Sequence, residues 1–245
     1  QTMRDSVATG LSAWTDIDCM SMDLEILDEG EGFSPCPGEV VEDTIQCIYW
    51  VHSNADWGFG SGLIAVTLVH HNALTGEIVD TDMAINGSGT FTWSAPDACD
   101  FDTPDHDLLA TLTHEFGHFF GLDHSSAPQS VMEAATGPGD CDKRTLADFD
   151  KTCLCDTLAE TSARVAAQQA LPDDRDTIND TSEEVAIRGE TDAHHERPEP
   201  PHEPAGCVVG DHQPLPALWA LMLMWVGVHR ARRRLRLRSD PAQAH

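Results

Sequence analysis

Basic residues are scarce in this chain of 245 residues. Its 14 lysines and arginines stand against 42 aspartates and glutamates, which gives a formal net charge of -28. Six of the 14 are arginines that follow His229, so the preceding residues carry eight basic and 41 acidic side chains, a balance of -33. A surface this acidic repels the phosphate backbone of DNA and RNA. The composition therefore argues against a nucleic-acid-binding protein.

The sequence also lacks an apolar run long enough to cross a membrane comfortably. The uninterrupted apolar stretch at residues 215–228 has 14 residues, fewer than the roughly 18 to 20 that a spanning helix needs. The arginine cluster that follows it is the positive charge expected on the inner side of a membrane. A transient sorting helix and a permanent anchor both fit this stretch. No export signal is visible in the first 30 residues, so we expect that it has been removed or that the sequence is a fragment.

None of the eight cysteines lies in the paired C-x-x-C spacing of a zinc ribbon. Eight cysteines exceed ordinary cytosolic usage and indicate an oxidising compartment outside the cytoplasm. Cys141, Cys153 and Cys155 are therefore expected in disulfides rather than as metal ligands, although spacing does not give the pairing. Seven cysteines remain when Cys207 is set aside, so at least one of them is either free or paired with Cys207.

Hydrophobic periodicity predicts a mixture of helices and strands. Apolar residues at three- and four-residue intervals predict a first helix over residues 2–16. Alternating and β-branched runs predict strands over residues 20–26, 45–51, 63–69 and 77–85, of which the last two form a hairpin. Thr103 and Pro104 offer a cap and a first-turn proline for a helix that runs to Gly121. A third helix is expected over residues 145–169.

The composition changes after the third predicted helix. From residue 172 to residue 206 the chain is rich in Asp, Glu, Pro, Thr and His and poor in large apolar residues. Such a stretch buries too little apolar surface to offset the loss of chain entropy on folding. We therefore predict three parts: a folded domain over residues 1–170, a disordered acidic stalk over 171–206, and a sorting or membrane-anchor segment over 207–245.

One segment carries a pattern of metal ligands. Residues 113–124 read T-H-E-F-G-H-F-F-G-L-D-H and contain H-E-x-x-H-x-x-G-x-x-H. His114 and His118 are four residues apart on a predicted helix, so both side chains can reach one ion. Gly121 can adopt the left-handed conformation that ends the helix and lets His124 approach the same ion. Three neutral imidazoles leave one open position on a tetrahedral Zn2+, which is typical of a catalytic zinc site.

Glu115 follows the first of these histidines and is expected beside the open position. Its carboxylate can take a proton from a water whose pKa zinc lowers, and can then pass that proton to a leaving amine. These proton transfers are those of peptide-bond hydrolysis. Chance would produce the five fixed positions in roughly one of 10⁴ such sequences. A zinc site without catalysis is the other interpretation, and the intact Glu115 argues against it.

These residues resemble the metzincin metalloproteases, and within them the matrixin-like branch. His124 is followed by two serines, as in the family's G-L-D-H-S ending, and Ser130-Val131-Met132 looks like the Met-turn beneath the zinc. The tyrosine that serves some metzincins as an additional ligand has no counterpart, because Ala134 stands at that position. The resemblance implies three zinc ligands, a catalytic glutamate and a methionine beneath the metal: His114, His118, His124, Glu115 and Met132.

The resemblance covers about residues 2–160 and implies an α+β fold. The expected domain has a twisted mixed sheet above a cleft, an active-site helix beneath it and a small C-terminal subdomain. It also implies extended protein or peptide substrates that pair with an antiparallel edge strand, here at residues 63–70. A bare sheet edge without a ligand is the other interpretation of that strand. His70 and His71 are expected to be solvated rather than to bind a second, structural zinc.

The end of the chain resembles the MYXO-CTERM class of bacterial sorting tails, with Cys207 before a short apolar helix and an arginine cluster. This implies processing at the cell envelope, followed by surface display or release; a single-pass anchor also places the domain outside. We therefore predict a monomeric zinc endopeptidase that is extracellular or held at the bacterial cell surface. Two alternative functions are a non-catalytic zinc-containing surface protein that binds a peptide partner, and a zinc-dependent amide or ester hydrolase.

Overall fold

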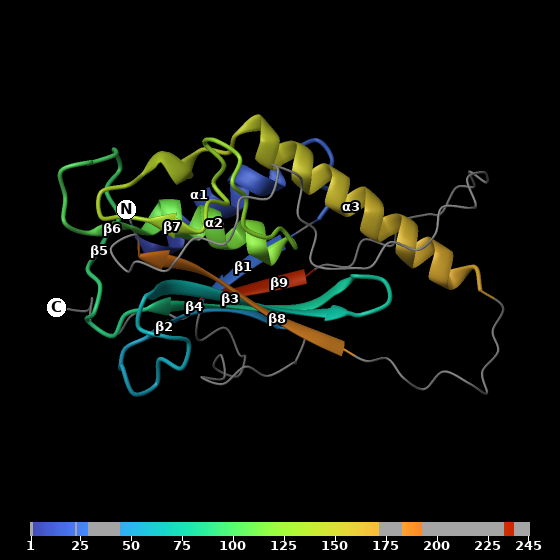
Figure 1. The fold of residues 1–245 in the computed structure, drawn as a ribbon, viewed down its shortest axis with the longest axis horizontal. Helices are drawn as coiled ribbons and strands as arrows, with labels where there is room; N and C mark the ends of the chain where they lie inside the picture. Colours follow the sequence, from blue (N-terminus) through green and yellow to red (C-terminus); the bar gives the residue numbers. More distant parts are fainter. Residues whose placement is uncertain (1, 23, 29–44, 172–182, 193–232, 238–245) are drawn as a thin grey trace.

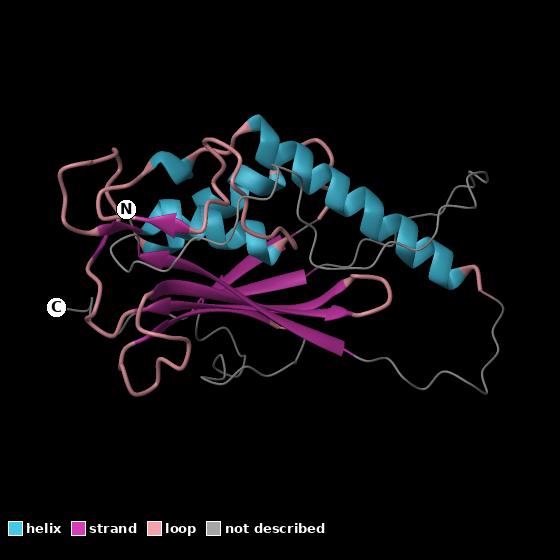
Figure 2. Cartoon of the chain, viewed as in Figure 1, coloured by secondary structure: helices cyan, strands magenta, loops and turns pink. Residues whose placement is uncertain are grey.

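A computed structural model describes residues 2–22, 24–28, 45–171, 183–192 and 233–237. Within these residues the helices cover one side of a seven-stranded sheet (Figures 1 and 2). The helices are α1 (Met3–Thr15), α2 (Leu108–Phe119) and α3 (Asp148–Gln169), with a 3-10 helix at Asp142–Arg144. The sheet strands are β1 (Leu24–Asp28), β2 (Gln46–Val51), β3 (Leu63–Asn72), β4 (Ile78–Asn86), β7 (Ala135–Thr136), β8 (Glu183–Asp192) and β9 (Arg233–Leu237). Two short strands, β5 (Trp93–Ser94) and β6 (His106–Asp107), pair separately.

The large sheet is mixed, in the order β1-β9-β2-β4-β3-β8-β7. Strands β2 and β4 are parallel, whereas β3 runs antiparallel to β4 and to β8. Strands β3 and β4 form the predicted hairpin, in which Gly76 adopts a φ of 72° that favours glycine. The predicted α+β fold is confirmed: α2 lies against β3 and β4, and α3 follows it in a C-terminal subdomain.

The first and second helices begin at side-chain caps. Thr2 caps α1 in a capping box with Asp5, as the predicted start at residue 2 requires. Helix α2 begins at Leu108, five residues after the predicted cap at Thr103, so the predicted start was wrong. Asp107 caps it instead by accepting a hydrogen bond from the Ala110 amide at 2.8 Å. The Arg144 guanidinium binds the same carboxylate and holds the helix start in place.

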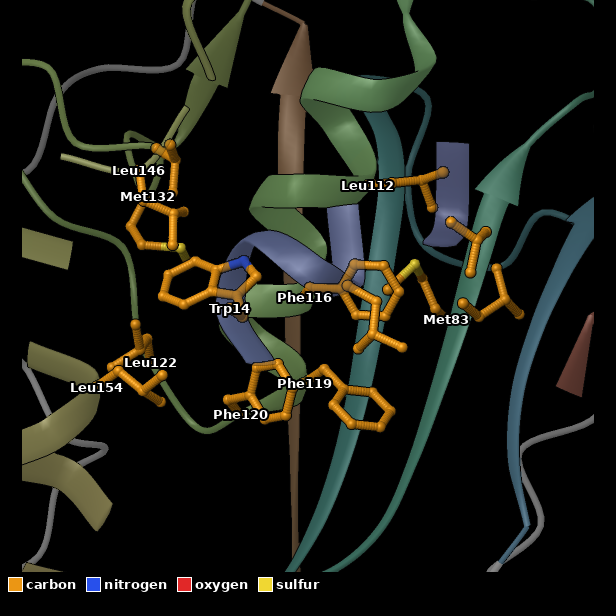
Figure 3. Packing of buried hydrophobic residues seen from close by; sticks show 14 of the residues in the cluster. Trp14, Met83, Leu112, Phe116, Phe119, Phe120, Leu122, Met132, Leu146 and Leu154 are labelled. Atoms are coloured by element: carbon orange, nitrogen blue, oxygen red, sulfur yellow. The ribbon is translucent and has the colours of Figure 1, made fainter. Parts of the chain in front are cut away.

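The main core lies between the helices and the sheet. Trp14 of α1 and Phe116 of α2 are fully buried in it, and the Trp14 indole donates a hydrogen bond to the Thr113 carbonyl at 2.8 Å. Figure 3 shows Met132 beside the Trp14 ring. This packing fixes α2, which carries the motif, against both α1 and the loop that contains Met132.

All six described cysteines are in disulfides, as expected for Cys141, Cys153 and Cys155. Cys19, which follows α1, is joined to Cys155 of α3 across 136 residues of sequence. Cys99 is joined to Cys141 just before the 3-10 helix. These two cross-links connect the loops and helices around the motif helix, and no cysteine sulfur in the described chain remains available to bind a metal.

Besides the start of α2, the structure differs from the sequence predictions in three places. Residues 183–192, predicted as part of a disordered stalk, form β8, because the side of β3 that faces away from β4 offers main-chain partners to an extended segment. His70 and His71 are buried rather than solvated, since β3 is flanked on both sides. Part of the predicted arginine cluster forms β9 between β1 and β2. The predicted apolar helix at 215–228 lies outside the described residues; none of the helices that the structure describes could span a membrane.

Candidate active site

The motif histidines converge on one point. His114 and His118 lie on successive turns of α2, and both are fully buried. Gly121 has a φ of 97° and turns the chain out of the helix, which brings His124 back toward the other two. One ligand nitrogen from each ring lies within 4.8 Å of the others, and the Nε2 atoms of His118 and His124 are 3.2 Å apart.

The hydrogen bonds of two rings leave their Nε2 atoms free to bind a metal. Nδ1 of His114 lies 2.6 Å from the Val131 carbonyl, and Nδ1 of His118 lies 2.7 Å from the Leu122 carbonyl. A carbonyl only accepts, so each Nδ1 carries the proton and each Nε2 presents a lone pair. The buried Nε2 of His114 has no hydrogen-bond partner among the described residues. Imidazole nitrogens that converge on one point, one of them without a hydrogen-bond partner, are the donors that Zn2+ prefers, so the site fits zinc.

Burial keeps these imidazoles neutral. Desolvation lowers the pKa of His114 and of His118 well below the ordinary value, and the neighbouring cationic groups lower them further. Desolvation, assisted by Lys143 and Arg188, lowers the pKa of His124 to about 4. A metal ion binds the neutral form of histidine, so the surroundings prepare all three rings as ligands without the cost of removing a proton.

Glu115 follows His114 on α2 and is fully buried. Its Oε2 accepts a hydrogen bond from the Thr67 hydroxyl of β3 at 2.5 Å, and its Oε1 accepts one from the Glu190 amide of β8 at 3.2 Å. Burial raises the pKa of Glu115 to about 8, although the Thr67 hydrogen bond opposes the rise. A carboxyl group with a pKa near neutrality can both take up and release a proton, as a general base and acid must.

We expect Thr67→Val to lower kcat on a peptide substrate by about 10-fold, because the Glu115 carboxylate loses the donor that orients it. Thr67→Ser retains the hydroxyl and should recover most of the loss. Steady-state kinetics with both variants would separate kcat from KM. A purely structural role for Thr67 predicts instead that kcat is unchanged wherever the variants are folded.

The Met132 loop is held beneath the histidines by Asp150 of α3. Oδ1 of Asp150 accepts a hydrogen bond from the Ser130 hydroxyl at 2.5 Å, and Oδ2 accepts one from the Val131 amide at 3.1 Å. The carbonyl of Val131 is the group that holds His114. Met132 itself is buried against α2, where a Cβ on Gly117 would lie 2.2 Å from its sulfur. Asp150 thus orients His114 indirectly, through the main chain of Val131.

We expect Asp150→Ala to lower the free energy of unfolding by about 3 kcal/mol, because buried donors lose their acceptor. It should also weaken zinc binding by roughly 10- to 100-fold, because the partner of His114 is no longer fixed. Denaturant unfolding and competition with a zinc chelator measure the two effects. Asp148→Ala is the matched control, because that carboxylate is fully exposed and its removal should leave stability nearly unchanged. An unchanged zinc affinity for Asp150→Ala would contradict this role.

Strand β8 and Lys143 complete the site, and sequence reasoning missed both. The Glu190 side chain of β8 is fully buried and forms an ion pair with the buried Lys143. Burial raises the pKa of Glu190, and the Lys143 ammonium opposes the rise. Arg188 of β8 pairs with Asp123 at 2.8 Å. The one sequence feature that could have drawn attention to Lys143 is the scarcity of lysine, because the chain has only two lysines.

The fold is a metzincin-like α+β domain, and its cluster of three histidines can bind a zinc ion. Residues 50–154 match the Matrixin peptidase family. A 50-residue segment is 53% identical to the human protein "Matrix metalloproteinase-25". That segment is 20% of this chain and 9% of the human protein, so the chain matches less than a tenth of that relative's length. These similarities support the metalloprotease resemblance of the core, over a shorter span than residues 2–160.

Proposed function

We propose that this protein is a zinc-dependent endopeptidase that hydrolyses peptide bonds in extended protein substrates outside the cytoplasm. The observation that carries the proposal is the position of Glu115. Glu115 directly follows His114, one of three convergent imidazoles, on α2, and its buried carboxylate accepts a hydrogen bond from the main-chain amide of an extended strand. A peptidase requires this arrangement, because the same carboxylate must reach both the attacking water and the amide nitrogen of the bond that breaks. The similarity to the Matrixin family supports the same activity.

In the proposed mechanism, His114, His118 and His124 would hold the zinc and Glu115 would move the proton. Zinc, when bound, supplies Lewis acidity that activates water and polarises the substrate carbonyl. Glu115 takes the proton from the attacking water as general base. It then delivers this proton to the departing amide nitrogen as general acid, and Thr67 keeps the carboxylate in place during both transfers. Met132 would support the histidines from below.

Extended substrates would bind along β3. Among the described residues β3 is not an edge strand, because β8 pairs antiparallel with it from Leu63 to Asn72. A substrate would pair with β3 in place of β8. Main-chain pairing of this kind recognises an extended backbone before it recognises side chains. The predicted edge position of residues 63–70 is wrong for the described structure, and the pairing of a substrate with this strand stays a proposal. The excess of negative charge is compatible with basic substrates or with solubility alone.

We also propose that the domain acts in an oxidising compartment, as an extracellular or cell-surface monomer. The disulfides at all described cysteines support this location. The MYXO-CTERM-like residues 207–245 would attach the chain to the bacterial envelope or allow its release there. This part of the proposal is tested by fractionating cells and asking whether the domain is found in the medium or the envelope; recovery from the cytoplasm alone would contradict it.

The activity is tested by incubating the full chain with denatured casein, with and without a zinc chelator. We expect cleavage that stops on chelation and returns when zinc is added back, with product ends identified by mass spectrometry. A panel of ester and small amide substrates, run in parallel, should remain intact. If the chain holds one zinc and cleaves no unfolded protein, it is instead a non-catalytic zinc protein that binds a peptide partner.

A further inference from the structure

Strand β8 lies along β3 and contacts the motif helix α2, in the manner of a bound peptide. From Glu183 to Thr191 it pairs antiparallel with β3, with Val66 opposite Gly189 and Ala65 opposite Glu190. Thr191 and Asp192 then pair in parallel with β7, which lies on the other side of β8. An extended segment of the chain is therefore held by main-chain contacts on both sides, directly over the Glu115 carboxylate.

The Gly189–Glu190 peptide bond is the bond presented to Glu115. The amide nitrogen of Glu190 donates to Glu115 Oε1 at 3.2 Å, and this nitrogen would become the leaving amine if that bond were cut. Gly189 fits closely against β3: a Cβ there would lie 2.7 Å from the Ala65 carbonyl oxygen and 3.0 Å from a Val66 methyl group. Only glycine brings the backbone this near without displacing β3.

The residue after this bond is recognised by charge. The Glu190 carboxylate is fully buried and pairs with the ammonium group of Lys143, which also donates to the Glu133 carbonyl. Lys143 is itself buried, so a neutral side chain in place of Glu190 would leave its charge without an anionic partner there. The second residue before the bond is recognised as well, because Arg188 pairs with Asp123 and donates to the Leu122 carbonyl at 3.2 Å.

We propose that residues 183–192 are an intramolecular substrate, cut between Gly189 and Glu190, and that Lys143 selects an acidic residue immediately after the bond. This rests on the peptidase function proposed above. Water adds its oxygen to the Gly189 carbonyl carbon, the bond to the Glu190 nitrogen breaks, and Glu115 transfers the water's proton to that nitrogen. The products are residues 1–189, ending in a carboxylate, and residues 190–245, beginning with a new amine. Cleavage breaks the main-chain connection between residues 1–189 and residues 190–245, and β3 becomes free for other substrates when the two cut ends leave β3 and β7.

The cleavage is tested on the full chain prepared without zinc and then supplied with it. After reduction of disulfides, intact-mass measurement should show the two fragments, and sequencing of the smaller one should begin Glu190-Thr191-Asp192. The Glu115→Gln chain should stay whole. If casein is cut while the Gly189–Glu190 bond survives, this proposal is overturned and the peptidase function stands. If neither is cut, the peptidase function itself fails.

An intramolecular reaction has a rate that does not depend on protein concentration. We expect the half-life of the uncut chain to stay constant over a 100-fold dilution. A half-life that lengthens in proportion to dilution would show that one molecule cuts another, which would overturn the intramolecular part of the proposal.

The role of Lys143 is tested with peptides of the sequence V-A-I-R-G-E-T-D, taken from residues 185–192, and the same peptide with Glu190→Gln. The wild-type chain should prefer the glutamate peptide in kcat/KM by on the order of 100-fold, since a buried charge pair is otherwise broken. Lys143→Met should abolish that preference, and Lys151→Met, which changes an exposed lysine, should keep it. Equal rates on both peptides with the wild-type chain would overturn the selection, whether or not Lys143→Met folds.

Discussion

Glu115→Gln is expected to lower kcat/KM on denatured casein by about 10³-fold while zinc content and fold are retained. The amide is nearly the same size as the carboxylate, so the buried site should remain packed. It cannot take a proton from water or deliver one to the leaving amine, and general acid–base catalysis contributes roughly 10² to 10⁴ in rate. Proteolysis assays, with zinc measured in the same samples, provide the test.

Glu160→Gln is the matched control, because that carboxylate is partly exposed on α3 and pairs only locally with Arg164. It should leave proteolysis unchanged. A Glu115→Gln protein that holds zinc and retains more than about a tenth of wild-type activity would mean that another group moves the proton. A Glu115→Gln protein that loses both zinc and folded structure would show that the residue is mainly structural.

His124→Ala should remove most of the bound zinc and, with it, all measurable proteolysis. His124 is the one proposed ligand outside α2, and its removal leaves two imidazoles on one helix face. Two ligands hold zinc far more weakly than three, and a catalytic zinc site generally takes three from the protein. The fold should largely survive, because His124 is only partly buried whereas His114 and His118 lie inside the core.

Zinc per chain, measured by elemental analysis after dialysis, should fall from about one to well below one in His124→Ala. The exposed His52→Ala is the control and should keep its zinc and its activity. Full zinc occupancy in His124→Ala would remove His124 from the ligand set, and the third ligand would then have to be sought elsewhere.

The motif helix could be predicted from sequence because its signals are local. Histidines four residues apart share a helix face whatever the rest of the chain does, and Gly121 supplies its own turn. The hairpin of β3 and β4 is likewise local in sequence. The start of α2 was misplaced because Asp107 caps the helix together with Arg144, a partner 37 residues away that no local pattern reveals.

The remaining parts of the site depend on contacts between distant segments. Lys143 meets Glu190 across 47 residues, and the Glu190 amide meets Glu115 across 75. Composition alone gave residues 171–206 as disordered, because it counts apolar area and ignores the main-chain partners that β3 and β7 offer. His70 and His71 were expected to be solvated for the same reason: β8 on the far side of β3 was not foreseen.

The proposed activity requires three imidazoles to bind one zinc ion with one coordination position left open. Zinc-edge X-ray absorption of the purified chain tests this directly. We predict that the zinc ion is coordinated by four nitrogen and oxygen atoms, with scattering from three imidazoles and no sulfur. A shell that contains cysteine sulfur, or one with fewer than three imidazoles, would contradict it.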